Sequence, residues 1–112
     1  MTLTRYTYKG KGIFRSLHKD FEKADMSVSD EQNLYDAEEV FDRYMEVPDI
    51  CTDKIVQTRS YFTEEGLKEF RRALDTICYY ADLYLEHPVK VKTIDYAGEI
   101  LYKDYYQVVI PA

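Results

Sequence analysis

The 112-residue sequence predicts one small α+β domain, residues 1–112, with about three helices packed on an antiparallel sheet. Three observations lead to this fold class. Both ends of the chain alternate with a period of two, and three stretches between them have helical periodicity. The hydrophobic fraction is 46% and the aromatic fraction 15%, which is enough to form a core. The predicted order is β-α-α-α-β-β-β, and the N-terminal strand pairs with a C-terminal hairpin or meander.

The first predicted elements are a strand over residues 2–9 and a helix over 12–24. Threonine and tyrosine favour strands, and the alternation stops at Gly10 and Gly12. Apolar residues then recur at helical spacing: Ile13, Leu17, Phe21 and Ala24. The glycines and lysines of residues 8–16 could hold an anion at a helix N-terminus. They match neither a P-loop nor a dinucleotide fingerprint, so a tight turn is the favoured interpretation.

The second predicted helix begins with Ser29 as its N-cap, is supported by Gln32 in a capping box, and is closed by Pro48. Its apolar face contains Leu34, Ala37, Val40, Phe41, Tyr44 and Met45. The opposite arc of about 100° contains Glu31, Tyr35, Glu38, Glu39, Asp42 and Glu46. The segment is therefore an amphipathic helix with an acidic outer face.

The remainder of the chain predicts one long helix followed by strands. A short strand is expected near Ile55 and Val56, in a segment whose pattern is weak. Thr63 is the predicted N-cap of a helix over about 64–86, which Pro88 follows. The period then changes to two over residues 89–96, 99–102 and 105–110, with turns at Ala97-Gly98 and Lys103-Asp104.

The net charge of −6 is unevenly distributed. Residues 1–19 contain five basic residues and no acid, whereas residues 20–53 contain twelve acids and two bases. An acidic chain is a poor binder of a nucleic acid backbone, so no direct contact with nucleic acid is expected. Neither a signal segment nor a membrane span is evident, and Cys51 and Cys78 are expected to be reduced thiols. We therefore expect a cytoplasmic, soluble protein.

No catalytic, cofactor or metal site is predicted. Cys78 and His87 are too far apart along the chain to form a local dyad, and Cys51 has no catalytic motif around it. His18 lies in the first predicted helix, before a lysine and an aspartate. The carboxylates Glu38, Asp42 and Glu46 recur every four residues, but no second helix offers the Glu-x-x-His that a bundle metal site needs. We expect a protein that is not an enzyme.

The acidic arc has two interpretations. Like charges four residues apart weaken a helix slightly, so such an arc either is solvated or neutralised by the basic N-terminal region, or serves to bind a basic partner. In the second case Glu31, Tyr35, Glu38, Glu39, Asp42 and Glu46 are the binding residues, with Tyr35 as an aromatic anchor. The chain would then be a small inhibitor, of the anti-CRISPR, immunity or DNA-mimic type, that occludes a nucleic-acid-handling surface.

A second candidate patch lies on the long helix, away from its main apolar face. It consists of Arg72, Thr76, Tyr79 and Leu83. Either neighbours cover this stripe, or it is a contact surface. The alternative function is therefore a structural or oligomerising accessory domain, which could form a homodimer. The short, acidic, tyrosine-rich chain resembles in general character the small proteins of phages and mobile elements, although no motif carries that resemblance.

Overall fold

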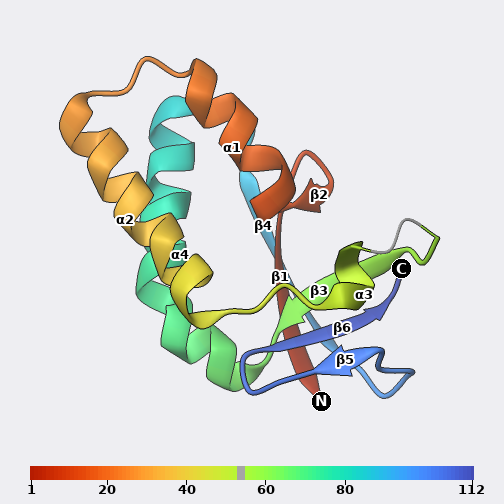
Figure 1. Cartoon of the computed structure of the whole chain (residues 1–112). Coiled ribbons are helices and arrows are strands. Elements are labelled where there is room, and N and C mark those ends of the chain that lie inside the picture. Colours follow the sequence, from red (N-terminus) through yellow and green to blue (C-terminus); the bar gives the residue numbers. More distant parts are fainter. Residues whose placement is uncertain (53–54) are drawn as a thin grey trace.

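In the computed structural model, the described residues form four helices and a six-stranded antiparallel sheet, which confirms the predicted α+β class. It describes residues 1–52 and 55–112, and it leaves the side chain of Arg15 undescribed. Figure 1 shows three helices gathered on one side of the strands: α1 (Ile13–Lys23), α2 (Val28–Tyr44) and α4 (Glu64–Tyr84). The short α3 (Asp49–Thr52) lies apart from them, beside β3 (Thr58–Phe62).

Strand β1 (Thr2–Tyr8) organises the sheet. It pairs along its whole length with β4 (Val89–Asp95), as the predicted pairing of the two ends of the chain requires. The other edge of β1 is shared by β3 and by the two-residue β2 (Lys11–Gly12), because a strand has only two edges. The sheet then continues from β3 to β6 (Gln107–Pro111) and ends at β5 (Tyr102–Lys103).

Aromatic side chains form the centre of the main core. Period-two alternation turns Tyr6 and Tyr8 of β1 toward the helices, where both are buried. Phe41 of α2 lies 5.1 Å from Phe70 of α4 and 6.1 Å from Phe62 of β3, measured between ring centroids. Each such ring pair contributes about 0.5–1.5 kcal/mol beyond the burial of its area. The rings therefore fasten α2 and α4 to the sheet.

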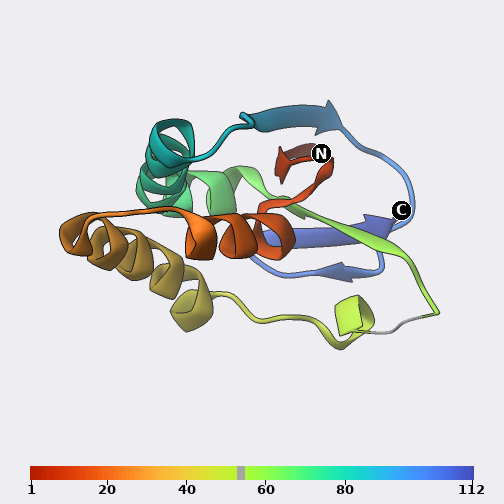
Figure 2. The same ribbon diagram turned by 90° about the horizontal axis from the view of Figure 1, so that it is seen from above.

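The opposite face of the sheet carries a smaller apolar cluster. Leu3 alternates with the core tyrosines of β1 and is buried with Tyr61, Val108 and Ile110 on this face. Both faces of the sheet therefore stabilise the domain, although the helices cover only one of them (Figure 2).

The N-terminus of α4 is fixed against the chain that leads into β6. The Thr63 hydroxyl accepts a hydrogen bond from the Gly66 N–H at 2.9 Å and donates one to the Tyr105 carbonyl at 2.7 Å. This geometry confirms Thr63 as the N-cap. A Cβ at Gly66 would lie 2.0 Å from the Tyr106 carbonyl oxygen, so only glycine permits this approach.

Helix α2 differs from its predicted bounds at both ends. Its N-cap is Ser27 rather than Ser29, and the Ser27 hydroxyl accepts the Asp30 N–H at 3.1 Å. A contact with α4 stabilises this earlier start, because the Tyr84 hydroxyl of that helix donates a hydrogen bond to Asp30. The helix ends at Tyr44, before Pro48, so Glu46 is not on its acidic arc.

The strand assignments were partly wrong. The weak segment forms β3 at 58–62 rather than a strand near Ile55, whose side chain is exposed, and it is preceded by the unpredicted helix α3. Residues 99–100 are not in a strand, and residues 105–106 form the turn before β6. The predicted turn at Gly10 is confirmed, since Lys9 and Gly10 have φ angles of 52° and 78°. None of the described helices combines the length and apolar character needed to cross a membrane.

Candidate partner-binding surface

The outer face of α2 remains exposed over part of the predicted acidic arc. Tyr35 is 62% exposed, and Glu31 in the first turn is also exposed. Glu31 lies near the positive end of the helix dipole, where a carboxylate stabilises the helix. These two residues are accessible to a partner, as the binding interpretation requires.

Two carboxylates in the middle of the arc already have partners within the chain. Glu39 accepts a hydrogen bond from Arg43 at 2.9 Å, so this basic residue forms an ion pair on the acidic face. Glu38 is half-buried and lies 3.9 Å from the imidazole of His18 on α1. Burial raises the pKa of the Glu38 carboxyl above its ordinary value, His18 opposes this rise, and Asp42 adds to it. Glu38 and Glu39 are thus less available than their neighbours.

The last two acidic residues, Asp42 and Glu46, lie at the rim of a groove of about 390 Å³. Asp42 is on the final turns of α2, whereas Glu46 is on the extended segment that follows it. The buried Gln107 of β6 holds that segment, because its amide nitrogen donates to the Glu46 carbonyl at 2.7 Å and to the Asp104 carboxylate at 3.1 Å. A core contact therefore positions Glu46, although its carboxylate is exposed.

The groove is assembled from parts of the chain that are distant in sequence. Its floor includes the buried rings of Phe41 and Phe62, and it is also lined by Tyr61, whose ring belongs to the cluster on the opposite face of the sheet. Phe14 at the start of α1 and Val47 beyond α2 form its outer walls and are 56% and 74% exposed. The Phe14 ring contacts the Phe41 ring at 4.9 Å between centroids. The groove thus exposes apolar surface that is continuous with the core.

Among the described residues, Arg5 is the basic residue that lines the groove. Its guanidinium lies 6.0 Å from the centre of the Tyr61 ring, within the range of a cation–π contact. Among the described residues, no salt bridge joins Arg5 to Asp42 or Glu46. The two carboxylates at the rim therefore keep their hydrogen-bonding capacity for other groups.

The basic N-terminal region neutralises little of the acidic face. Lys9 pairs with Asp20 of α1 at 2.7 Å, and the Tyr8 hydroxyl donates to the same carboxylate. These two hydrogen bonds lower the pKa of Asp20 below its ordinary value. Of the described side chains in residues 1–19, that of His18 alone lies within salt-bridge distance of a carboxylate of α2, at 3.9 Å from Glu38. The expectation that this region might shield the arc is met at Glu38 only.

The second predicted patch, on α4, is also accessible. Tyr79 is 63% exposed and Leu83 is 56% exposed. Arg72, which precedes both on the same helix, is also exposed. Thr76 is half-buried and donates its hydroxyl to the Arg72 carbonyl at 3.0 Å. Neighbouring elements therefore leave much of this stripe uncovered, and it lies on a different helix from the acidic face.

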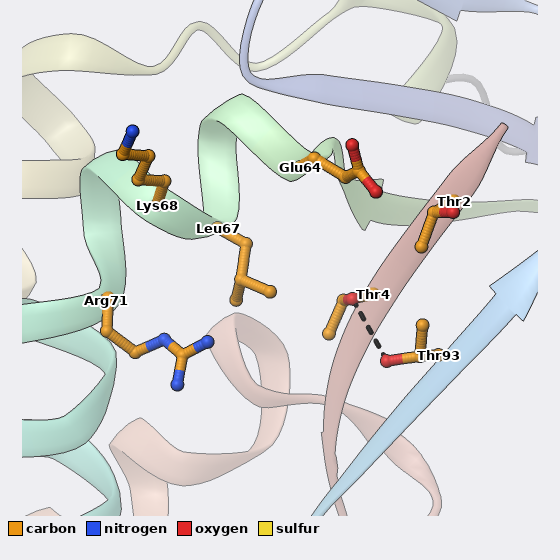
Figure 3. Close-up of a pocket in the computed structure, with 7 residues that line it drawn as sticks. All are labelled: Thr2, Thr4, Glu64, Leu67, Lys68, Arg71 and Thr93. Carbon is orange, nitrogen blue, oxygen red and sulfur yellow. Dashed lines mark hydrogen bonds between the residues drawn. The ribbon is translucent and has the colours of Figure 1, made fainter.

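A second hollow, also of about 390 Å³, lies between α4 and the β1–β4 pair. Figure 3 shows Thr2, Thr4 and Thr93 projecting from the strands toward α4, while Lys68 turns away from them. The Thr4 and Thr93 hydroxyls lie 3.1 Å apart and hydrogen-bond to each other. Leu67 and the charged Glu64 and Arg71 complete this cleft. Two of its three strand threonines therefore satisfy each other.

The cysteines occupy unlike environments. Cys51 lines the groove, and its thiol lies 3.7 Å from the Ser60 hydroxyl. Burial, aided by Asp75 and Asp82, raises the pKa of the Cys78 thiol to about 11, which suppresses its reactive thiolate form. Neither cysteine is in a disulfide. Within residues 1–52 and 55–112, no three His, Cys, Asp or Glu side chains are grouped to hold a metal ion.

No protein-family model, curated protein or solved structure matches this chain. Its function is therefore argued from the geometry alone. The sequence pointed to Asp42 and Glu46, but not to the groove that they border. Phe14 and Val47 carried a weak signal, since each is a large apolar residue beside the predicted core faces.

Proposed function

We propose that this protein is a non-enzymatic binding module that uses the acidic surface around α2 to engage a basic surface of a partner protein. Its narrower form is an inhibitor that occludes a surface for handling nucleic acid, as anti-CRISPR proteins, immunity proteins and DNA mimics do. The observation that carries the proposal is the exposed set Glu31, Tyr35, Asp42 and Glu46, whose carboxylates form no salt bridge with any described side chain of residues 1–19.

The physical argument combines attraction with an anchor. Uncompensated carboxylates on one surface create a negative potential that speeds encounter with a positively charged protein and disfavours acidic ones. Tyr35 adds a rigid ring with a hydrogen-bonding hydroxyl, a residue type that often dominates binding energy in interfaces. Surfaces that bind nucleic acid have clustered Lys and Arg side chains. An array of carboxylates can bind those side chains and so cover the surface.

The test reverses the two carboxylates that are most accessible at the rim. Wild-type protein, Asp42→Lys/Glu46→Lys, and a control with the same change of charge elsewhere, Asp82→Lys/Glu99→Lys, are each immobilised and exposed to lysate of the source cells. All four substituted residues are exposed. We expect a basic nucleic-acid-binding protein to be retained by wild type and by the control and to be lost with the rim reversal.

Purified captured protein then allows a kinetic measurement. The association rate with wild type should fall as salt is raised, and nucleic acid should compete for the complex. Equal capture by the rim reversal and the wild type would contradict the proposal, as would an association rate that does not depend on salt.

A second candidate function is self-association through α4, which is supported by the exposure of Tyr79 and Leu83. It predicts a concentration-dependent dimer in analytical ultracentrifugation that Leu83→Lys disrupts. A wild-type monomer at every concentration would eliminate it.

A further inference from the structure

We infer that the groove at the end of α2 is the anchor pocket of the acidic surface. Its occupant would be a large apolar side chain, aromatic or leucine-sized, flanked by Arg or Lys in a segment of the partner protein. This inference rests on the proposed function and specifies what the surface recognises.

The shape and composition of the groove support an apolar occupant. Its volume of about 390 Å³ is within the range of protein sites that enclose ligand groups. Phe41 and Phe62 provide a buried aromatic floor. Phe14 and Val47 remain exposed at the walls, and a side chain inserted between them would remove that apolar surface from water.

The charges at the rim favour basic neighbours of that side chain. An occupant that covers Asp42 and Glu46 without offering donors would desolvate two carboxylates and leave them unpaired. Arg or Lys beside the apolar residue supplies the donors, and arginine can bind a carboxylate through two parallel hydrogen bonds. An acidic segment would be repelled, since Asp42 and Glu46 outnumber Arg5, the one basic residue among the described residues of the lining.

A second copy of this chain is a poorer occupant. Among the described residues, exposed sequences of similar composition include Arg43-Tyr44, where Arg43 is already paired with Glu39, and Lys90–Lys92 on β4, where Val91 lies between two lysines. In a strand, alternate side chains point to opposite faces, so both lysines point away from the face that carries Val91. That segment cannot insert Val91 while its lysines meet the rim.

The inference is tested by NMR titration of ¹⁵N-labelled protein with three capped peptides. The probe is Lys-Arg-Phe-Arg-Lys, and the controls are Lys-Arg-Ala-Arg-Lys and Glu-Asp-Phe-Asp-Glu. We expect the probe to shift the amide signals of Phe14, Val47 and Cys51 and to bind about tenfold more tightly than the alanine control. The acidic control should leave those signals unchanged.

A matched pair of variants locates the contact. Val47→Ser removes an exposed valine from the groove wall, and Val28→Ser removes one from the first turn of α2, outside the groove. Val47→Ser should weaken binding of the probe severalfold, and Val28→Ser should leave it unchanged. Iodoacetamide modification of Cys51 should also slow when the probe is bound.

The outcomes separate this inference from the proposed function. Equal binding of the phenylalanine and alanine peptides, both lost with Asp42→Lys/Glu46→Lys, would overturn the anchor pocket and leave the acidic surface standing. Equal binding of the acidic peptide, or no shift at the groove with any peptide, would overturn the inference. So would a dimer in sedimentation analysis whose formation shifts the same groove signals, because the occupant would then be a second copy.

Discussion

The two hollows of this domain have the same volume, about 390 Å³, but different chemistry. The groove at the end of α2 has an aromatic floor, two exposed apolar walls and two carboxylates at its rim. The cleft beside α4 has three threonines on its strand side, and the Thr4 and Thr93 hydroxyls bond to each other. Two of the cleft's threonine hydroxyls thus satisfy each other, whereas the groove exposes apolar walls that a partner could cover. Volume alone therefore does not distinguish a binding site.

The largest effect should come from the floor of the groove. Phe41→Ala removes a buried ring that contacts Phe14, Phe62 and Phe70, so it should lower the free energy of unfolding by about 3–5 kcal/mol. Leu67→Ala in the half-buried wall of the cleft should cost less. Urea unfolding measures both variants, and equal losses would contradict the view that Phe41 lies at the centre of the core and Leu67 at its margin.

Two glycines give the next comparison. Gly66→Ala places a methyl group against the Tyr106 carbonyl and should destabilise the fold by about 1–3 kcal/mol through overpacking. Gly12→Ala, in the lining of the groove, meets no atom nearer than the Arg5 guanidinium at 3.6 Å and should have little effect. Thermal unfolding of both variants checks this difference, and a costly Gly12→Ala with a silent Gly66→Ala would contradict it.

The threonine pair should show a smaller coupling. Thr4→Val leaves the Thr93 hydroxyl without this partner and should cost about 1 kcal/mol. In a double-mutant cycle, adding Thr93→Val should cost less than it does alone. If the losses in the free energy of unfolding from the two single variants simply add in the double variant, the hydroxyls contribute independently. That result would contradict a stabilising hydrogen bond between Thr4 and Thr93.

The smallest effect concerns Glu38, which belongs to the helix packing more than to the rim. Its raised pKa means that the charged carboxylate is disfavoured in the folded chain. The free-energy penalty of ionising Glu38 in the folded chain is absent at low pH, and it grows as pH rises through the pKa that this carboxyl has in the folded state. Glu38→Gln also removes its repulsion with Asp42, so it should raise the melting temperature at pH 7 by about 1–3 °C. Unchanged melting temperatures at both pH 7 and pH 3 would contradict the assignment.

Local patterns were sufficient to predict much of the fold. The cap at Thr63 and the periodicity of α4 depend on sequence features of single elements. The N-terminal strand pairs with a C-terminal strand as predicted, but the C-terminal strands do not form one hairpin or meander, because β4 pairs with β1 and β6 pairs with β3 and β5. The first residue of α2 could not be chosen in this way, because Ser27 and Ser29 both fit the local rule and a distant tyrosine favours the earlier one. The strand was predicted too early in the chain, near Ile55, because the polar residues Arg59 and Ser60 of β3 obscure the alternation of apolar and polar side chains.

The candidate site was only partly predictable for the same reason. Acidic residues on one helix face are visible in the sequence, so Glu31, Tyr35 and Asp42 could be identified. The groove combines residues 5–14, 41–51 and 58–62 with Gln107, and no local pattern joins these segments. The end of α2 at Tyr44 then moved Glu46 from the helix to the groove rim, where the carbonyl contact with Gln107 holds it.

The most direct test of the central claim is site-specific photo-crosslinking in source-cell lysate. A photoreactive phenylalanine analogue replaces Val47 at the groove, or Lys68 at the cleft, in otherwise wild-type protein. We predict a crosslink from position 47 to one basic protein, its loss in the Asp42→Lys/Glu46→Lys background, and no such product from position 68. A crosslink to the same protein from position 68 alone, or one from position 47 that survives the charge reversal, would contradict the account.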